Sequence, residues 1–101
     1  MNTKAKISLV LTEAERERIG KNSTEGKLTI DLHGMKVKEA KRFINNLIAI
    51  NREKQKITCI HGFNHGTALK GLITGLDNPR IKNRFSPGEN PGITVLVIAA
   101  A

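Results

Sequence analysis

The chain has 101 residues, of which 17 are Lys or Arg and 9 are Asp or Glu, so its formal net charge is +8. A chain of this length suits one small domain, and its single cysteine excludes an intrachain disulfide. Its longest apolar stretch, residues 93–101, is about half of the ~20 residues of a membrane span, so we predict a small cytoplasmic protein that stays out of the membrane and is attracted to polyanions.

Residues 1–26 are expected to form an extension ahead of the main domain. Thr12 is followed three residues later by Glu15, which is the spacing of a capping box at the amino terminus of a helix. Gly20 is expected to end this short helix. The polar residues 21–26 show no periodicity and are expected to be a linker.

Residues 27–101 are predicted to form the main domain. Apolar and polar residues alternate over residues 28–33, as they do in a strand with one buried face. Gly34 interrupts this alternation. From Met35 to about Lys54, apolar residues recur with helical spacing and predict an amphipathic helix.

The second half of the domain is predicted to contain three more strands and one helix. Residues 56–60 form a short and nearly continuous apolar run, which predicts a strand buried on both faces. A glycine-rich loop over residues 61–66 leads into a helix with apolar positions between residues 68 and 76. Residues 81–85 and 93–98 predict two final strands, separated by a connection rich in turn-forming residues.

The predicted order of elements is β-α-β-α-β-β, with four strands and two helices. The first two strands are expected to be parallel, and ligands of such sheets bind beyond the carboxyl ends of the strands. Asp31 and His33 end the first strand, and His61 ends the second. Asp31 and His33 are two residues apart, so their side chains leave the same face, and we expect His61 to lie close to both.

A carboxylate beside two imidazoles suits general acid–base catalysis, because imidazole titrates near neutrality and a carboxylate can fix its tautomer. Two alternatives remain for these residues. Asp31 could cap the following helix or hold a loop amide, with His33 bonded to the backbone. Asp31, His33 and His61 could also form a metal site of two histidines and one carboxylate.

The glycine-rich loop is a candidate anion site. Gly62 and Gly66 bracket a turn that leads into a helix amino terminus, where unpaired amides and a partial positive charge suit a phosphate. Asn64 can adopt the left-handed conformation that otherwise requires glycine. Thr67 can cap the helix, and Lys70 lies within one turn of the same helix end.

The positive charge is concentrated in the predicted main domain. Residues 1–26 carry five basic and four acidic side chains, a net +1, whereas residues 27–101 carry twelve basic and five acidic side chains, a net +7. Such a surface can simply keep a protein soluble, or it can be the electrostatic footprint of nucleic-acid binding. The charge by itself does not choose between these interpretations.

Two motifs give the chain a family resemblance. Ile-Asp-Leu-His-Gly at residues 30–34, an amphipathic helix, and then Ile-His-Gly-x-x-x-Gly at residues 60–66 resemble the small MutS-related (Smr) domain, here as a stand-alone protein. Pro-Gly-Ile-Thr-Val at residues 91–95 resembles the closing strand of that family. The resemblance covers about residues 27–99. It implies an α/β (α+β) two-layer sandwich, in which two helices cover a mixed four-stranded sheet, similar to the carboxyl-terminal domain of bacterial translation initiation factor three.

The resemblance also implies nucleic-acid binding and, in several members of the family, nicking or endonucleolytic cleavage of DNA or RNA. The family positions transfer to Asp31, His33, His61 and the two loop glycines, Gly62 and Gly66. The chain departs from the family at the middle glycine of the loop, which is an asparagine here. The family also includes members whose role is nucleic-acid binding without cleavage.

The motifs and the charge together predict a nucleic-acid-binding protein that nicks or cleaves DNA or RNA, with Asp31, His33 and His61 as catalytic residues. One alternative is a non-catalytic module that binds nucleic acid or the ribosome, and another is an enzyme acting on a small phosphorylated metabolite. No cofactor is predicted, and a divalent metal such as Mg²⁺ or Mn²⁺ stays an open alternative. The residues predicted to contact nucleic acid are Gly34, Lys36, Lys38, Gly62, Asn64, His65, Gly66, Thr67, Lys70 and Arg84.

Overall fold

The computed structural model describes residues 11–24, 26–62, 67–88 and 90–101 of the chain. Its helices and strands are α2 (Glu13–Glu17), β1 (Lys27–Asp31), α3 (Val37–Ile50), β2 (Gln55–Ile60), α4 (Thr67–Gly75), β3 (Ile81–Phe85) and β4 (Ile93–Ile98). From β1 onward, this order confirms the predicted β-α-β-α-β-β succession. Among the described residues, no helix combines the length and the apolar character needed to cross a membrane.

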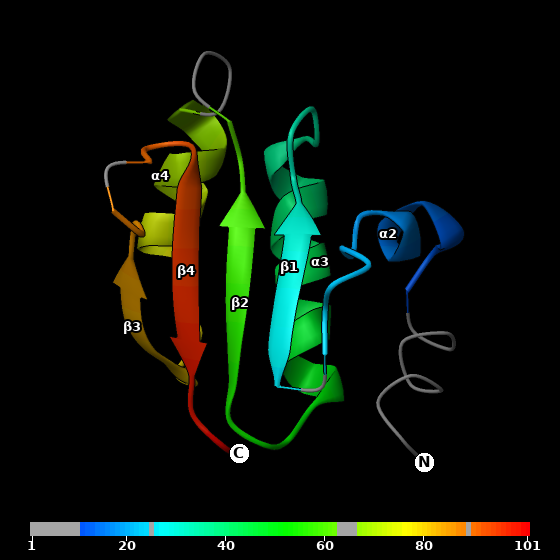
Figure 1. Ribbon diagram of the computed structural model, residues 1–101, viewed down its shortest axis with the longest axis vertical. Helices are drawn as coiled ribbons and strands as arrows, with labels where there is room; N and C mark the ends of the chain where they lie inside the picture. Colours follow the sequence, from blue (N-terminus) through cyan, green and yellow to red (C-terminus); the bar gives the residue numbers. More distant parts are fainter. Residues whose placement is uncertain (1–10, 25, 63–66, 89) are drawn as a thin grey trace.

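The four strands form one mixed sheet in the order β1-β2-β4-β3. As predicted, β1 and β2 run parallel, whereas β4 is antiparallel to both β2 and β3. Figure 1 shows α3 and α4 together behind this sheet, which confirms the two-layer α/β sandwich. We call the other face of the sheet the open face. On β1 and β2 the open face consists of Lys27, Thr29, Asp31, Lys56, Thr58 and Ile60.

The hydrophobic core lies between the sheet and the helices. In α3 the buried positions recur three or four residues apart, so they share one face of the helix. These buried residues of α3 are Ala40, Phe43, Ile44, Leu47, Ile48 and Ile50. The strands add Leu28, Ile30, Ile57, Cys59, Leu96 and Ile98 to the same cluster.

The prediction that β2 is buried on both faces is wrong. Ile57 and Cys59 are fully buried, but Lys56 is exposed, and Thr58 and Ile60 are half-buried. The helices cover one face of the sheet, and successive side chains of a strand point to opposite faces. Every second residue of β2 therefore lies on the open face.

The helix α3 is shorter than the predicted range of residues 35–54, because it begins at Val37 and ends at Ile50. At its carboxyl end, Asn51 takes an extended conformation with φ −107° and ψ 117°. The Oδ1 atom of Asn51 accepts a hydrogen bond from the Glu53 N–H at 3.0 Å. This local turn redirects the chain into β2, and the hydrophobic periodicity did not reveal it.

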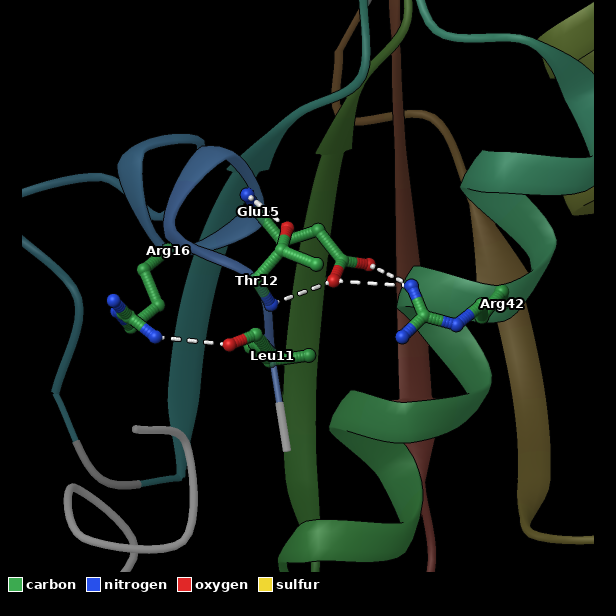
Figure 2. Close-up of polar contacts among 5 residues, drawn as sticks. All are labelled: Leu11, Thr12, Glu15, Arg16 and Arg42. Carbon is green, nitrogen blue, oxygen red and sulfur yellow. Dashed lines mark hydrogen bonds and ion pairs between the residues drawn. The ribbon is translucent and has the colours of Figure 1, made fainter. Parts of the chain in front are cut away.

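The short helix α2 begins with the predicted capping box, which Figure 2 shows. The Glu15 N–H donates to Thr12 Oγ1 at 3.1 Å, and the Thr12 N–H donates to Glu15 Oε1 at 2.9 Å. The same carboxylate accepts from Arg42 Nη1 of α3, with N···O distances of 3.2 and 3.1 Å. The capping box therefore also ties α2 to α3. The helix ends at Glu17, earlier than predicted.

The residues that follow α2 pair with the outer edge of β1 instead of continuing the helix. The Gly20 N–H donates to the Thr29 carbonyl at 2.7 Å, and the Asp31 N–H donates to the Arg18 carbonyl at 2.9 Å. Leu11, ahead of α2, is buried in the hydrophobic core. The described part of the predicted extension therefore packs closely on the sheet and on α3.

The single cysteine, Cys59, is a core residue of β2. Burial disfavours the charged thiolate and raises the pKa of the Cys59 thiol to about 12. The thiol therefore stays protonated at neutral pH. Since the thiolate is the reactive form of cysteine, we assign Cys59 a packing role.

Candidate functional site

An aspartate and a histidine form a hydrogen-bonded pair at the carboxyl end of β1. Asp31 is the last residue of β1, and His33 lies in the turn that follows. The His33 Nδ1 atom lies 2.5 Å from Asp31 Oδ1, and the His33 backbone N–H donates to the same oxygen at 3.1 Å. The side chains are 73% exposed for His33 and 42% exposed for Asp31. A macromolecular partner can therefore reach both.

The surroundings of Asp31 favour its charged form. Burial raises the pKa of this carboxyl, but the hydrogen bonds from the His33 ring and backbone lower it by more, with help from the positive charges of His33 and Arg18. The net pKa of Asp31 lies below its usual value of 3.8. Asp31 is therefore ionised at neutral pH and accepts the Nδ1–H of His33. A neutral imidazole held in this way carries its lone pair on Nε2, as a general base oriented by a carboxylate does.

The Asp31–His33 pair predicts how the Asp31 carboxyl titrates. We expect the Asp31 carboxyl, followed by NMR, to titrate below pH 3.8 in the wild type and at higher pH in His33→Ala, because the ring hydrogen bond is lost. Since the pKa is lowered in the folded state, the pair stabilises the fold above the unfolded pKa of about 3.9. That contribution is lost as the pH falls through the folded value. If the Asp31 carboxyl of His33→Ala titrated with the same midpoint pH as in the wild type, that result would contradict this account.

Arg18, which lies outside both predicted motifs, holds the turn that carries the pair. Its Nη1 atom donates to the Asp31 carbonyl at 3.0 Å and to the His33 carbonyl at 2.9 Å. The guanidinium thus bridges two carbonyls of the turn and brings a positive charge near the Asp31 carboxyl. No sequence motif predicted this role of Arg18. Its alternation with glutamates over residues 15–18 is typical of an exposed helix, and no spacing links it to residue 31.

Gly34 shapes the turn after His33. Its φ is +77°, and a Cβ atom at this position would meet no atom within 4 Å. Glycine is therefore required by the backbone conformation and not by a lack of space. The helix α3 begins directly afterwards, with Lys36 as its N-cap residue and Lys38 in its first turn. Both lysines are exposed, so they are available to a charged ligand.

We expected His61 to lie close to Asp31 and His33, but the structure places its side chain away from this pair. His61 is only 2% exposed. Its Nε2 atom hydrogen-bonds to Thr94 Oγ1 at 2.9 Å, and its Nδ1 atom lies 3.2 Å from the Gly62 carbonyl oxygen. The strand register sets Asp31 opposite Ile60. The next residue, His61, therefore points to the other face of the sheet.

The buried position of His61 predicts an effect on stability. We expect His61→Ala to lower the free energy of unfolding by about 1–3 kcal/mol, because the buried Thr94 hydroxyl loses its partner. Urea denaturation followed by circular dichroism measures this change. The matched variant His61→Gln keeps a hydrogen-bonding amide and is expected to lose less. A wild-type urea midpoint for His61→Ala would rule out the structural role.

The glycine-rich loop is described only at its beginning. Gly62 has φ +85°, and its N–H donates to the Gly92 carbonyl at 3.1 Å. This contact fixes the start of the loop against the residue that precedes β4. Three predicted contacts to nucleic acid, Asn64, His65 and Gly66, lie outside the described residues.

Two predicted contacts lie in α4, and a third supports that helix from β3. Thr67 begins α4, and Lys70 is half-buried in it. Arg84 reaches the other end of α4, where its Nη2 atom donates to the Leu76 carbonyl. The Arg84 Nε atom is buried and has no hydrogen-bond partner among the described residues. A cation is favoured at a helix carboxyl terminus, so Arg84 stabilises the end of α4.

Within the described ranges, no three His, Cys, Asp or Glu side chains gather in a way that could hold a metal ion. The candidate site consists of the Asp31–His33 pair, the turn at Gly34 and the supporting guanidinium of Arg18. The exposed imidazole of this site, that of His33, is oriented by its hydrogen bond to Asp31 and is accessible to solvent. No family model, no curated protein and no solved structure matches this chain.

Proposed function

We propose that the chain is a nucleic-acid-binding protein of the Smr type that cleaves phosphodiester bonds in DNA or RNA. The observation that carries this proposal is the Asp31–His33 pair, in which an exposed imidazole is oriented by an ionised carboxylate. The motif around Asp31 and His33 and the loop that begins at Gly62 support it through their resemblance to the Smr domain. The net +7 of residues 27–101 supplies the attraction to a polyanion.

The proposed reaction requires one general base, which is the exposed imidazole of His33. With RNA, His33 Nε2 takes the proton of a 2′-hydroxyl, whose oxygen then forms a bond to the adjacent phosphorus. The bond from that phosphorus to the 5′-oxygen breaks, and the leaving oxygen takes a proton from water. The hydroxide left by that water takes the proton from the His33 imidazolium, which restores the neutral imidazole. Asp31 stabilises the imidazolium that forms. With DNA, a water molecule supplies the attacking oxygen in place of the 2′-hydroxyl.

The proposed binding surface surrounds the pair. Lys36 and Lys38 are exposed at the amino end of α3, within five residues of His33. Contacts of this kind go to phosphates and position a strand without reading its sequence. We therefore propose a salt-sensitive interaction with little sequence preference.

A second candidate function is binding without cleavage, as in a module for nucleic acid or the ribosome. The burial of His61 favours it, because the described residues place no second imidazole beside His33. This candidate predicts salt-dependent binding and no cleavage under any metal condition. The two candidates therefore differ in whether the purified chain cleaves nucleic acid.

The test is a panel of single- and double-stranded DNA and RNA, incubated with the purified chain in Mg²⁺, in Mn²⁺ and in EDTA. Cleavage of any substrate that disappears in an identically purified His33→Ala sample supports the endonuclease. Binding with no cleavage in all conditions supports the second candidate. Absence of both cleavage and binding at low salt would contradict the two candidates together.

We also propose a cytoplasmic location. A single cysteine whose thiol is buried and protonated suits a reducing compartment, where structural disulfides are rare. Nucleic acid is the expected partner there.

A further inference from the structure

The guanidinium of Arg18 lies against the backbone of the Asp31–His33 pair, although Arg18 belongs to the segment that precedes β1. Its Nη1 atom donates to the Asp31 carbonyl at 3.0 Å and to the His33 carbonyl at 2.9 Å. The Arg18 carbonyl accepts in turn from the Asp31 N–H at 2.9 Å. Arg18 is therefore held through its side chain and its main chain, next to the residue whose imidazole is the proposed general base.

Most of the hydrogen-bonding capacity of this guanidinium is not used within the described part of the chain. A guanidinium has five N–H donors, and the two bonds to the carbonyls account for both N–H groups of Nη1. The other three N–H groups, on Nη2 and Nε, have no hydrogen-bond partner among the described residues. No acidic side chain of the described ranges forms an ion pair with Arg18. The residue is half-buried, so part of it stays accessible to solvent.

The unused donors of Arg18 form the edge of a guanidinium that suits a phosphate. The N–H of Nε and one N–H of Nη2 point in the same direction, and such a fork binds two oxygens of a phosphate side by side. This edge is positioned before a ligand arrives, because Nη1 is already anchored on two carbonyls. The exposed ammonium groups of Lys36 and Lys38, by contrast, are carried on flexible stems and offer no fork.

The charge of Asp31 creates a need for a cation at this place. Asp31 is ionised at neutral pH, and its negative charge repels a phosphate that approaches the ring of His33. Besides His33, Arg18 is the residue whose positive charge acts on the Asp31 carboxyl. The imidazole is neutral when it acts as a base, whereas arginine keeps its charge. Arg18 is therefore the residue that can offset the charge of Asp31 while His33 takes a proton.

We propose that Arg18 binds the phosphate on which His33 acts, with Nη2 and Nε as donors to its two non-bridging oxygens. These donors would also stabilise the negative charge that develops on the phosphate oxygens during the attack. Because it adds a phosphate-binding group to the same site, this role of Arg18 rests on the proposed function. A free phosphate ion offers the same oxygens, so the experiment includes both sources.

The first arm is an NMR titration of the wild-type chain that follows the Nε–H signal of Arg18. The probes are inorganic phosphate and a dinucleoside monophosphate of thymidine, which carries one phosphodiester and no 2′-hydroxyl. We expect the Arg18 signal to shift and to saturate with both probes. Arg16 is the internal control, because it lies in the neighbouring α2 and its Nη1 donates to the Leu11 carbonyl at 2.9 Å (Figure 2). Its Nε–H signal should not move.

The second arm measures the binding of an eight-nucleotide single-stranded oligonucleotide by fluorescence anisotropy over a range of salt concentrations. Arg18→Gln removes the charge and the fork, and Arg16→Gln removes one charge nearby as the matched control. If Arg18 contacts one phosphate, the slope of log K against log salt should become shallower by about 0.7 in Arg18→Gln. We expect Arg16→Gln to keep the wild-type slope. Arg18→Lys keeps the charge without the fork, so it should bind the thymidine probe several-fold more weakly than the wild type.

The outcomes separate the role of Arg18 from the proposed function. Oligonucleotide binding with an unmoved Arg18 signal and equal slopes for Arg18→Gln and Arg16→Gln would overturn the role of Arg18 and leave the proposed function intact. Equal shifts of Arg16 and Arg18 would show unspecific attraction of anions and would also overturn that role. Saturable shifts of Arg18 with phosphate, but no oligonucleotide binding, would establish a free-phosphate site and overturn the proposed nucleic-acid function. Selective shifts of Arg18 together with the shallower slope would support both.

Discussion

Replacing His33 by alanine is expected to slow the proposed phosphodiester cleavage by about 10²–10⁴-fold, which is the usual contribution of a positioned general base. The imidazole is 73% exposed and contacts Asp31 through Nδ1, so its removal takes away the base without opening a cavity. The fold and the lysines of α3 remain. Binding of nucleic acid should therefore change little.

The measurement is the initial rate of cleavage of a fluorescently labelled substrate at saturating concentration, with the dissociation constant measured in parallel. Ser86→Ala, which truncates another exposed side chain, is the matched control and should cleave at the wild-type rate. Asp31→Asn should lose activity as well, since the carboxylate orients the ring. A His33→Ala variant with the wild-type rate would remove the pair from the catalytic mechanism.

Replacing Phe43 by alanine is expected to lower the free energy of unfolding by about 3–5 kcal/mol. Phe43 is fully buried in the core, on the face of α3 that covers the sheet. The substitution removes a large apolar group and leaves a cavity that the surrounding strands and helices can fill only in part. Urea denaturation at 25 °C measures the loss.

Val37 supplies the matched control for Phe43, because it lies on the same helix and is 41% exposed. Val37→Ala is expected to change the free energy of unfolding by no more than about 0.5 kcal/mol. Equal effects of the two substitutions would mean that α3 does not pack on the sheet through the face described here.

The sequence predicted the fold well where the pattern is local. Alternation over residues 28–33 predicted β1, and helical spacing predicted α3. The two-residue spacing of Asp31 and His33 predicted that their side chains share a face, and in the structure they form a hydrogen-bonded pair. The end of α3 was missed, because the turn at Asn51 depends on one side-chain hydrogen bond that leaves no trace in the periodicity.

The position of His61 and the role of Arg18 were not predicted, because both depend on contacts between segments that are distant in the sequence. The position of His61 is decided by the register between β1 and β2, and a shift of one residue changes the face on which a side chain lies. Arg18 reaches its two carbonyls only because residues 18–20 pair with β1. Neither contact has a sequence spacing that could reveal it.

The pairing of residues 18–20 with β1 also determines what the edge of the sheet presents to other chains. β1 is an edge strand of the sheet, and an unpaired edge is a template for strand addition from another copy of the chain. The bonds from Gly20 to Thr29 and from Asp31 to Arg18 occupy that template. A chain shortened to begin at residue 27 would keep all four strands and yet present a bare edge to its neighbours. The segment ahead of β1 therefore covers a sheet edge that would otherwise be open to strand addition.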